Sequence, residues 1–197
     1  ALQKYKDALY AGKNARDADL IDDEKKATQD IHLLTNKPIL YIANCAEEQL
    51  TDPEKLYDNS YHLEVPLILI SAKIESELNE LNDTECGEYL EALGIKETGL
   101  NRLIKEAYKT LGLITFLTAG EQETRAWTIR DGAKAPEGAG VIHTDFERGF
   151  IAADVIPWQD LYAQGGWANA RAHGLVRTEG KNYTIKDGDV CLFKFNV

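Results

Sequence analysis

The sequence of 197 residues contains no methionine, only three cysteines and only four histidines. The cysteines, Cys45, Cys86 and Cys191, are odd in number and far apart, which argues against a disulfide framework and favours a reducing compartment. The histidines are equally scattered, so no metal site is expected. No apolar run approaches the length of about 20 residues that spans a bilayer. We therefore expect a cytoplasmic protein without a membrane segment.

Positive charge is also scarce, with 22 lysines and arginines against 33 acidic residues and a net charge of -11. Residues 1–112 carry 13 basic and 22 acidic side chains, whereas residues 113–197 carry 9 and 11. Bulk attraction to DNA, RNA or an anionic membrane is not expected, because each requires a basic surface. Any contact with RNA must be local. Since the chain also starts at Ala1 without a methionine, we expect an excerpt of a longer protein.

The first 35 residues have the apolar spacing of helices. This spacing predicts one helix over residues 1–12 and a second from Asp22, as the N-cap, to about Thr35. The apolar positions of the second helix share one face: Ala27, Ile31 and Leu34.

Two short apolar runs follow, at residues 39–43 and 65–70. Continuous runs of this kind are typical of parallel strands that are covered on both faces. A short helix is expected to start between them at Asp52-Pro53. Three further helices are expected at 73–81, 84–93 and 98–111. The order predicts an α/β domain with a βαβ unit, ending near Gly112.

From residue 113 the pattern changes to alternating strands and turn residues. Strands are expected at residues 113–119, 124–130 and 150–156, and a helix at Pro157. A final strand pair is expected at residues 183–185 and 190–195, around a turn that contains Gly188. A small mixed sheet with one or two helices across one face accounts for this order. The arrangement is an α+β fold of the β-grasp type.

Polar side chains follow both predicted parallel strands. Asn44 and Glu47 come after the first strand, and Ser71, Ala72 and Lys73 come after the second. Ligands of α/β domains bind outside the carboxyl ends of strands, so both groups lie where a nucleotide base binds. An Asn amide can donate to a purine N7, and a carboxylate can accept from the base edge. Taken alone, the NxxE pattern is very weak and favours simple strand-end and helix-start roles, but the paired Ser71-Ala72-Lys73 segment at the next strand supports the base site.

Four long segments resemble the YchF/Obg-like ATPase family of P-loop proteins. They are KPILYIANCAE at 37–47, ISAKIESEL at 70–78, the stretch from TGLNRLIKEAYKTLG to HTDFERGFI at 98–151, and EGKNYTIKDGDVCLFKFNV at 179–197. The resemblance implies that residues 1–35 are half of a helical arm, that 36–112 are the last part of the nucleotide domain and that 113–197 are a TGS domain. The fold would then be a remnant of the P-loop parallel sheet with its arm, followed by a β-grasp domain.

The resemblance also implies roles for individual residues. Asn44 and Glu47 match the family's NxxE base motif, with Cys45 where GTPases have a lysine, and Ser71-Ala72-Lys73 match its second base motif. The whole protein would hydrolyse ATP, or GTP, with Mg²⁺. This sequence has no GxxxxGK[ST] loop to hold the phosphates. We therefore expect no catalytic residue in this chain, no hydrolysis, no tightly bound cofactor and at most weak ATP binding.

The family signature HTDFERGF at 143–150 is the second candidate site. As a surface loop it would present His143 and Arg148, together with Arg130 and Lys134, to RNA or the ribosome. The alternative is that His143 is a structural histidine, Asp145 a cap, and Phe146 and Phe150 core residues. The tryptophans could stack on bases, but their apolar context favours the core: Trp127, Trp158 and Trp167.

Three functions remain open on these grounds. The first is a ribosome- or RNA-engaging part of a YchF-type protein that contacts its partner through the TGS domain and the arm. The second is an RNA- or protein-binding β-grasp module that acts without nucleotide. The third is a scaffold that binds a basic partner through the acidic arm. In all three, an open sheet edge near residues 38–44 could pair with a second copy of the chain.

Overall fold

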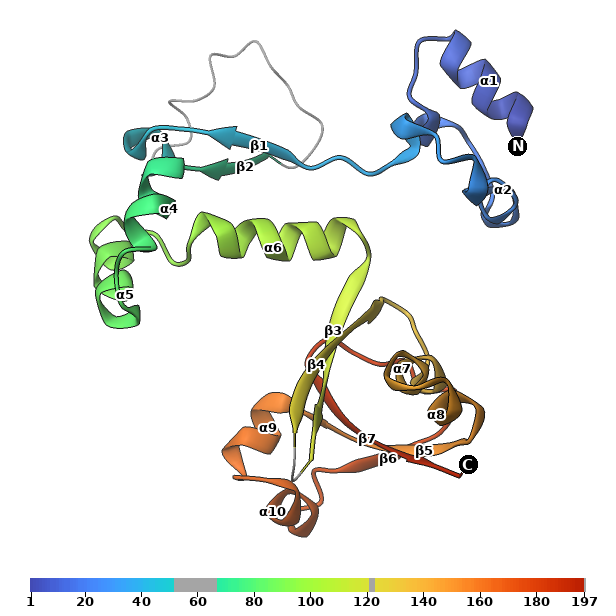
Figure 1. Cartoon of the computed structure of the whole chain (residues 1–197), viewed down its shortest axis with the longest axis vertical. Helices are drawn as coiled ribbons and strands as arrows, with labels where there is room; N and C mark the ends of the chain where they lie inside the picture. Colours follow the sequence, from blue (N-terminus) through green and yellow to red (C-terminus); the bar gives the residue numbers. More distant parts are fainter. Residues whose placement is uncertain (52–66, 121–122, 197) are drawn as a thin grey trace. The chain divides into compact units, whose positions relative to one another are not determined.

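The computed structural model describes residues 1–51, 67–120 and 123–196 (Figure 1). The chain divides into two compact units, Ala1–Thr110 and Leu111–Val197. The helix expected at Asp52-Pro53 lies outside the described residues.

The first 36 residues form short helices around a small apolar cluster. Helix α1, Leu2–Tyr10, is the predicted first helix. The single helix expected from Asp22 to Thr35 is wrong, because α2 spans only Asp22–Ala27. The Thr28 hydroxyl donates to the Glu24 carbonyl at 2.7 Å, and His32 adopts a left-handed conformation with φ 50°. Helix α2 ends at Thr28, its C-cap, where φ is −118°, and the chain continues from there as 3₁₀ turns.

This turn places the apolar residues differently from the predicted helical face. Ile31 and Leu34 are 42% and 79% exposed. The buried cluster instead consists of Tyr5, Ala15 and Leu20, with Leu33 packed against them. Packing within residues 1–36 thus overrides helical periodicity.

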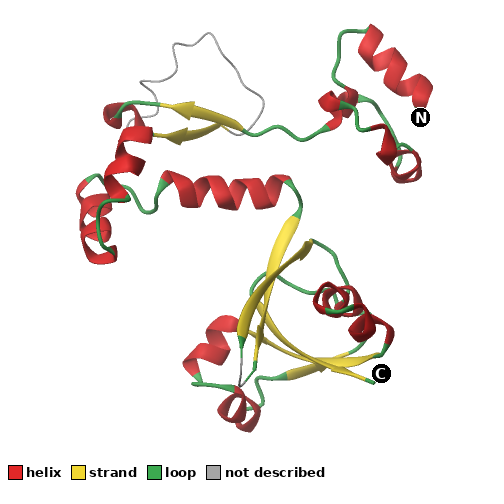
Figure 2. Ribbon diagram, viewed as in Figure 1, coloured by secondary structure: helices red, strands yellow, loops and turns green. Residues whose placement is uncertain are grey.

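Over residues 37–51 and 67–110, the described rest of the first unit forms two parallel strands and four helices (Figure 2). The strands are β1, Tyr41–Asn44, and β2, Leu67–Ile70, and the helices are α3, Glu47–Thr51, α4, Ala72–Leu78, α5, Asp83–Ala92, and α6, Gly99–Thr110. The register runs from Tyr41 opposite Leu67 to Asn44 opposite Ile70. The parallel pair and the last three helices confirm the predicted order.

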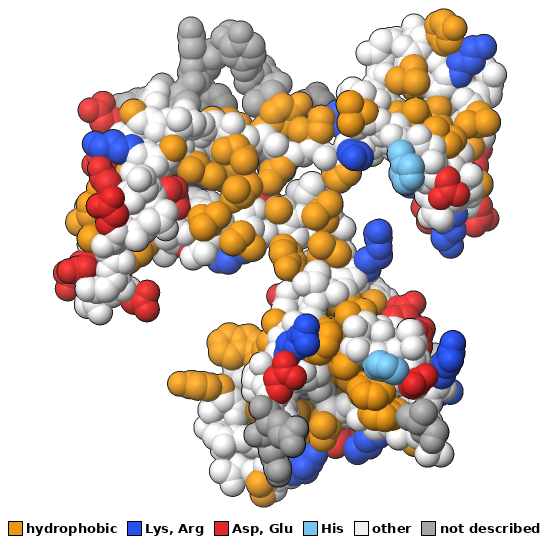
Figure 3. Space-filling view, in the orientation of Figure 1, with side chains coloured by type: hydrophobic (Ala, Val, Ile, Leu, Met, Phe, Trp, Pro, Cys, Tyr) orange, Lys and Arg blue, Asp and Glu red, His pale blue; other side chains and the backbone are white. Residues whose placement is uncertain are grey.

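Strand β1 is exposed, which corrects the prediction that both strands are covered on both faces. Tyr41 and Ile42 are 37% and 50% exposed, whereas Ile68 and Leu69 of β2 are buried. Apolar side chains gather over β1 and over α6, where Leu100 is 52% exposed (Figure 3). The described elements therefore cover β2 but leave an apolar surface on β1.

The second unit is a five-stranded mixed sheet with helices. Its strands are β3, Leu113–Ala119, β4, Thr124–Arg130, β5, Phe150–Pro157, β6, Arg177–Glu179, and β7, Asp189–Phe195. Its helices are α7, Ala135–Ile142, α8, Thr144–Arg148, α9, Trp158–Ala163, and α10, Trp167–Ala172. The strand order is β4-β3-β7-β5-β6, in which only β3 and β7 are parallel.

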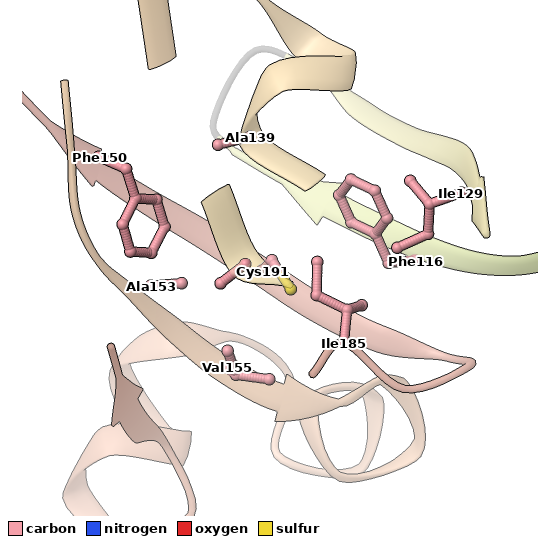
Figure 4. Packing of buried hydrophobic residues seen from close by; sticks show 9 residues of the cluster. Phe116, Ile129, Ala139, Phe150, Ala153, Val155, Ile185 and Cys191 are labelled. Atoms are coloured by element: carbon pink, nitrogen blue, oxygen red, sulfur yellow. The ribbon is translucent and has the colours of Figure 1, made fainter. Parts of the chain in front are cut away.

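Helices lie on both faces of this sheet, whereas the sequence predicted one covered face. Neighbouring residues of a strand point to opposite faces. Phe116 belongs to the cluster with Ala139 of α7, and Leu117 packs in the cluster with Leu161 of α9. Figure 4 shows the first cluster, to which Ala139 of α7 and Phe116 of β3 both belong. Strands β3, β5 and β7 are thus apolar on both sides in the middle of the sheet.

The expected strand pair around Gly188 is also wrong. Residues 183–185 form only one isolated bridge, from Thr184 to Lys134, and the additional strand is β6. The Asp189 carboxylate accepts from Lys186 N at 2.9 Å and from the Tyr183 hydroxyl at 2.7 Å. The backbone of residues 183–185 pairs instead with the segment before α7, where Ala135 N donates to Tyr183 O at 2.9 Å and Ile185 N donates to Ala133 O at 3.0 Å, so it does not run alongside β7.

Candidate nucleotide-base site

The carboxyl ends of β1 and β2 lie side by side. The parallel register sets Asn44 opposite Ile70, the residue before Ser71. Asn44 Oδ1 accepts a hydrogen bond from Ala72 N at 3.0 Å, and Cys45 N donates to Ile70 O at 2.9 Å. The two polar segments that the sequence singled out are therefore brought together.

These segments line one hollow of about 670 Å³. Asn44, Glu47, Ser71 and Lys73 line it together with Cys45 and residues 46, 48 and 49. The volume falls within the range of small-ligand pockets, roughly 300–1,000 Å³. The hollow is shaped by the turn after β1, where Gln49 Oε1 accepts from Ala46 N at 3.0 Å.

The hydrogen bond to Ala72 N orients the Asn44 amide. Because Oδ1 points to the backbone of α4, the amino group of Asn44 is left to donate to a ligand. Glu47 is exposed in the first turn of α3 and supplies an acceptor. Lys73 lies 3.7 Å from Glu77 and is 76% exposed, so its ammonium group can move to a ligand. The hollow thus offers a fixed donor, an acceptor and a mobile cation.

Cys45 forms the floor of this hollow and is buried. Burial raises the pKa of the Cys45 thiol, and the Arg102 charge offsets this effect only in part. A thiol with a raised pKa is a poor nucleophile at neutral pH. Cys45 therefore acts here as a small apolar residue.

Helices α4 and α6 hold β2 in place through two residues that the sequence analysis missed. The Glu75 carboxylate accepts from Gly99 N at 2.6 Å and from Leu100 N at 3.3 Å, which caps α6. Arg102 Nη2 donates to Leu69 O at 2.8 Å. A carbonyl of β2 that does not face β1 is thereby satisfied. Charged residues in a helical pattern gave no signal for either contact.

The candidate RNA contacts of the second unit fall into two places. His143 and Arg148 flank Asp145 in α8, with His143 Nδ1 at 3.4 Å and Arg148 Nη1 at 4.0 Å from its carboxylate. Lys134 lies before the first residue of α7, and Arg130 ends β4. Helix α7, eight residues and so about 12 Å long, lies between Lys134 and His143 in the chain.

The segment at 143–150 is a short helix and not a surface loop. His143 is its N-cap and accepts from Asp145 N at 3.2 Å, so the cap is His143 and not Asp145. Phe146 stacks on Phe195 with ring centroids 3.7 Å apart, and Phe150 is 3% exposed. Phe146 and Phe150 are therefore packing residues, as the alternative interpretation predicted. Arg148, by contrast, is 83% exposed.

The tryptophans differ in their surroundings. Trp127 Nε1 donates to Thr118 and Trp167 Nε1 donates to the Ala119 carbonyl, and both rings are partly buried. Trp158 is 46% exposed. Within residues 1–51, 67–120 and 123–196, no group of three acidic, histidine or cysteine side chains is arranged to hold a metal ion. The helices in the same ranges are all too short or too polar to cross a membrane.

Comparison with known proteins gives three concordant matches. A family model named YchF-GTPase_C and described as a protein of unknown function (DUF933) matches residues 113–196. The ribosome-binding ATPase YchF of Bacillus subtilis (strain 168) is 48% identical over 202 aligned residues, covering 100% of this chain and 55% of that protein. Obg-like ATPase 1 of Pongo abelii is 40% identical over 170 residues, covering 83% of this chain and 43% of that protein.

A solved structure agrees with the sequence matches. The Schizosaccharomyces pombe YchF GTPase superposes with a TM-score of 0.80 at 32% identity, covering 98% of this chain and 53% of that one. The chain thus spans about half the length of the curated relatives it matches. Together these matches show that the chain belongs to the YchF/Obg-like ATPase family.

Proposed function

We propose that the ends of β1 and β2 form the base-binding part of a nucleotide site in a YchF-type protein. The observation that carries this proposal is the bond from Ala72 N to Asn44 Oδ1 at 3.0 Å, which joins the two polar segments. The oriented amino group of Asn44 donates to N7 of a purine, and Glu47 accepts from an exocyclic amino group. Adenine carries N7 and its exocyclic amino group on the same edge, whereas guanine carries O6 beside N7.

The described residues do not fit the phosphates or Mg²⁺. The described ranges contain no candidate metal cluster, and the sequence contains no P-loop. Phosphate charge normally supplies much of the binding energy of a nucleotide, through backbone N–H groups and a lysine. We therefore assign base recognition to this chain and no step of hydrolysis. The ATPase and GTPase activities in the names of the relatives belong, in this proposal, to the whole protein.

Base recognition is tested on the chain itself by NMR titration with ATP. We expect backbone shifts confined to residues 44–47 and 71–73 and a dissociation constant in the millimolar range. The Asn44→Ala substitution removes the amino group that donates to the base and the oxygen that accepts from Ala72 N. We expect ATP to bind at least tenfold more weakly, which is about 1.4 kcal/mol.

The matched control is Asn79→Ala, which removes an exposed amide at the end of α4. It should leave the titration unchanged. Shifts elsewhere in the chain, or equal binding by Asn44→Ala, would contradict the base site. Sub-micromolar binding by calorimetry would contradict the assignment of base contacts alone.

We further infer that residues 113–197 are a TGS domain of the β-grasp type and that they contact the ribosome. The mixed sheet and the match at residues 113–196 support the first inference, and the names of the relatives support the second. Arg148, at 83% exposure, is the exposed cationic side chain of the family signature, and the His143 imidazole lies beside the same Asp145 carboxylate. The Arg148 guanidinium is suited to a phosphate of ribosomal RNA.

This contact is tested by cosedimentation of the chain with 70S ribosomes at low salt. We expect Arg148→Glu to weaken binding about three- to tenfold, because one attractive contact becomes repulsive. Lys96→Glu changes the charge equally in the first unit and serves as the control. Equal binding by the wild type and Arg148→Glu would exclude Arg148 from the interface.

A further inference from the structure

The end of strand β2 is held by hydrogen bonds from two different elements. The Ile70 carbonyl accepts from Cys45 N, just after β1, at 2.9 Å. The preceding carbonyl, of Leu69, accepts from Arg102 Nη2 of α6 at 2.8 Å. Ile70 lies opposite Asn44 in the strand register. The place of Asn44 against β2 therefore depends on a strand end that is bonded to α6 as well as to the base site.

Helix α4 is bonded to α6 just beyond the base site. Residues 71–73 of the candidate site lead into α4, and Glu75 follows two residues later. The Glu75 carboxylate accepts from Gly99 N at 2.6 Å and from Leu100 N at 3.3 Å, at the start of α6. Helix α6 thus binds the chain before residues 71–73, at Leu69, and again after them.

Gly99 lets the start of α6 approach both β2 and α4 closely. Gly99 is buried, and a Cβ atom at this position would lie 2.8 Å from Glu75 Oε1 and 3.1 Å from Ile70 Cγ1. Carbon atoms in favourable contact are about 3.5–4.0 Å apart, so a side chain here would displace its neighbours. The φ of Gly99 is not in the left-handed region. The close approach, and not the backbone conformation, therefore accounts for glycine.

Glu75 and Arg102 act on a ligand only indirectly. Among the described residues, neither of them lines the hollow beside Asn44. Their effect passes through residues 71–73 and the bond of 3.0 Å from Ala72 N to Asn44 Oδ1. This bond directs the amino group of Asn44 to a ligand only while Ala72 N stays in place. A donor that is held in its binding orientation loses less conformational freedom when the ligand binds.

We propose that Glu75 and Arg102 are positioning residues of the base site, which hold Ala72 N where it orients the Asn44 amide toward N7 of a purine. The inference rests on the proposed function and extends it to residues that touch no ligand. Loss of either set of bonds should weaken purine binding through the contact with N7, and should leave the other contacts of the base in place.

The test compares ATP with 7-deaza-ATP, in which a C–H group replaces N7, by NMR titration of the whole chain. The wild type should bind ATP about three- to tenfold more tightly, which is the usual worth of one hydrogen bond. Glu75→Ala and Arg102→Met remove the bonds to α6 on either side of residues 71–73. We expect the affinity ratio to fall toward one in both variants, while the affinity for 7-deaza-ATP stays nearly unchanged.

Three further variants separate positioning from folding. Glu75→Gln retains one acceptor oxygen for Gly99 N and should restore part of the ratio. Gly99→Ala keeps every bonding group and adds only a methyl group against the Glu75 carboxylate, so it should lower the ratio even if Glu75→Ala unfolds. Glu80→Ala is the matched control, because it removes an exposed carboxylate just beyond α4. It should leave the ratio as in the wild type.

The possible failures of the two proposals are distinguishable. A wild type that binds ATP and 7-deaza-ATP alike would exclude the N7 contact of the proposed function, and the positioning roles with it. A wild type that discriminates, with an unchanged ratio in the folded Glu75 and Arg102 variants, would overturn the positioning roles alone. Equal losses for both ligands would overturn them in the same way. Variants that all unfold would assign these bonds to folding and would equally overturn the positioning roles.

Discussion

Phe116→Ala is expected to lower the free energy of unfolding of the second unit by about 3–5 kcal/mol, the usual cost of removing a buried phenylalanine. Phe116 is fully buried, and its ring meets Phe193 edge-on with centroids 5.9 Å apart. It joins β3 to β7 and faces α7, so no neighbouring element can close the cavity alone. The change should lower the thermal midpoint by more than about 12 °C.

All three tryptophans lie in the second unit, so tryptophan fluorescence follows its unfolding in denaturant. The matched aromatic control is Tyr162→Ala in α9, where the side chain is 84% exposed. Its effect should stay within about 0.5 kcal/mol. If both variants unfolded at the same denaturant concentration, Phe116 would not be a core residue of this unit.

Asp154→Ala is expected to lower the free energy of unfolding by about 2–3 kcal/mol, because it removes a buried carboxylate that accepts hydrogen bonds from three side chains. Asp154 is 4% exposed and accepts from Lys194 at 2.6 Å, Thr178 at 2.7 Å and Arg171 at 3.3 Å. The two cations are about half exposed and can return to water, which keeps the cost below that of a stranded buried charge.

The hydrogen bonds to Asp154 also make the free energy of unfolding depend on pH. Burial raises the pKa of Asp154, but the hydrogen bonds from Lys194, Thr178 and Arg171 outweigh it and hold the pKa below its usual value. A group with a lowered folded pKa stabilises the fold above its unfolded pKa of about 3.9 and loses this contribution as the pH falls through the folded pKa.

Asp154→Asn retains the size of the side chain but does not titrate. We therefore expect the difference in unfolding free energy between the wild type and Asp154→Asn to be constant above about pH 5 and to shrink below pH 4. A difference that stayed constant down to pH 3 would show that the Asp154 carboxylate does not carry the effect.

The positions of most strands and helices could be predicted because they depend on local patterns. Apolar runs marked β1 and β2, and alternation marked β3, β4, β5 and β7. The helix over residues 22–35 failed because the backbone leaves the helical conformation at Thr28, with φ −118°, and again at the left-handed His32. Periodicity carries no information about these backbone conformations.

The strand at residues 183–185 failed for a related reason. The backbone of residues 183–185 bonds to Ala133 and Ala135, which are about 50 residues earlier, and a local pattern does not identify so distant a partner. The two-sided covering of the sheet was missed because Val155 and Ile156 are both buried, although they point to opposite faces. An apolar run of this kind does not reveal how many layers cover it.

The sequence by itself determined the family and the lack of a P-loop within residues 1–197, and it marked Asn44, Glu47 and Ser71–Lys73 as candidates for base binding, because these depend on identity and order along the chain. Only the tertiary structure decided that Asn44 Oδ1 is bonded to Ala72 N and that Asp154 accepts from Lys194 and Arg171. It also decided that β4 is an edge strand of the second sheet. These features join residues that are distant along the chain. Their distances depend on the packing of strands and helices, which local preferences do not specify.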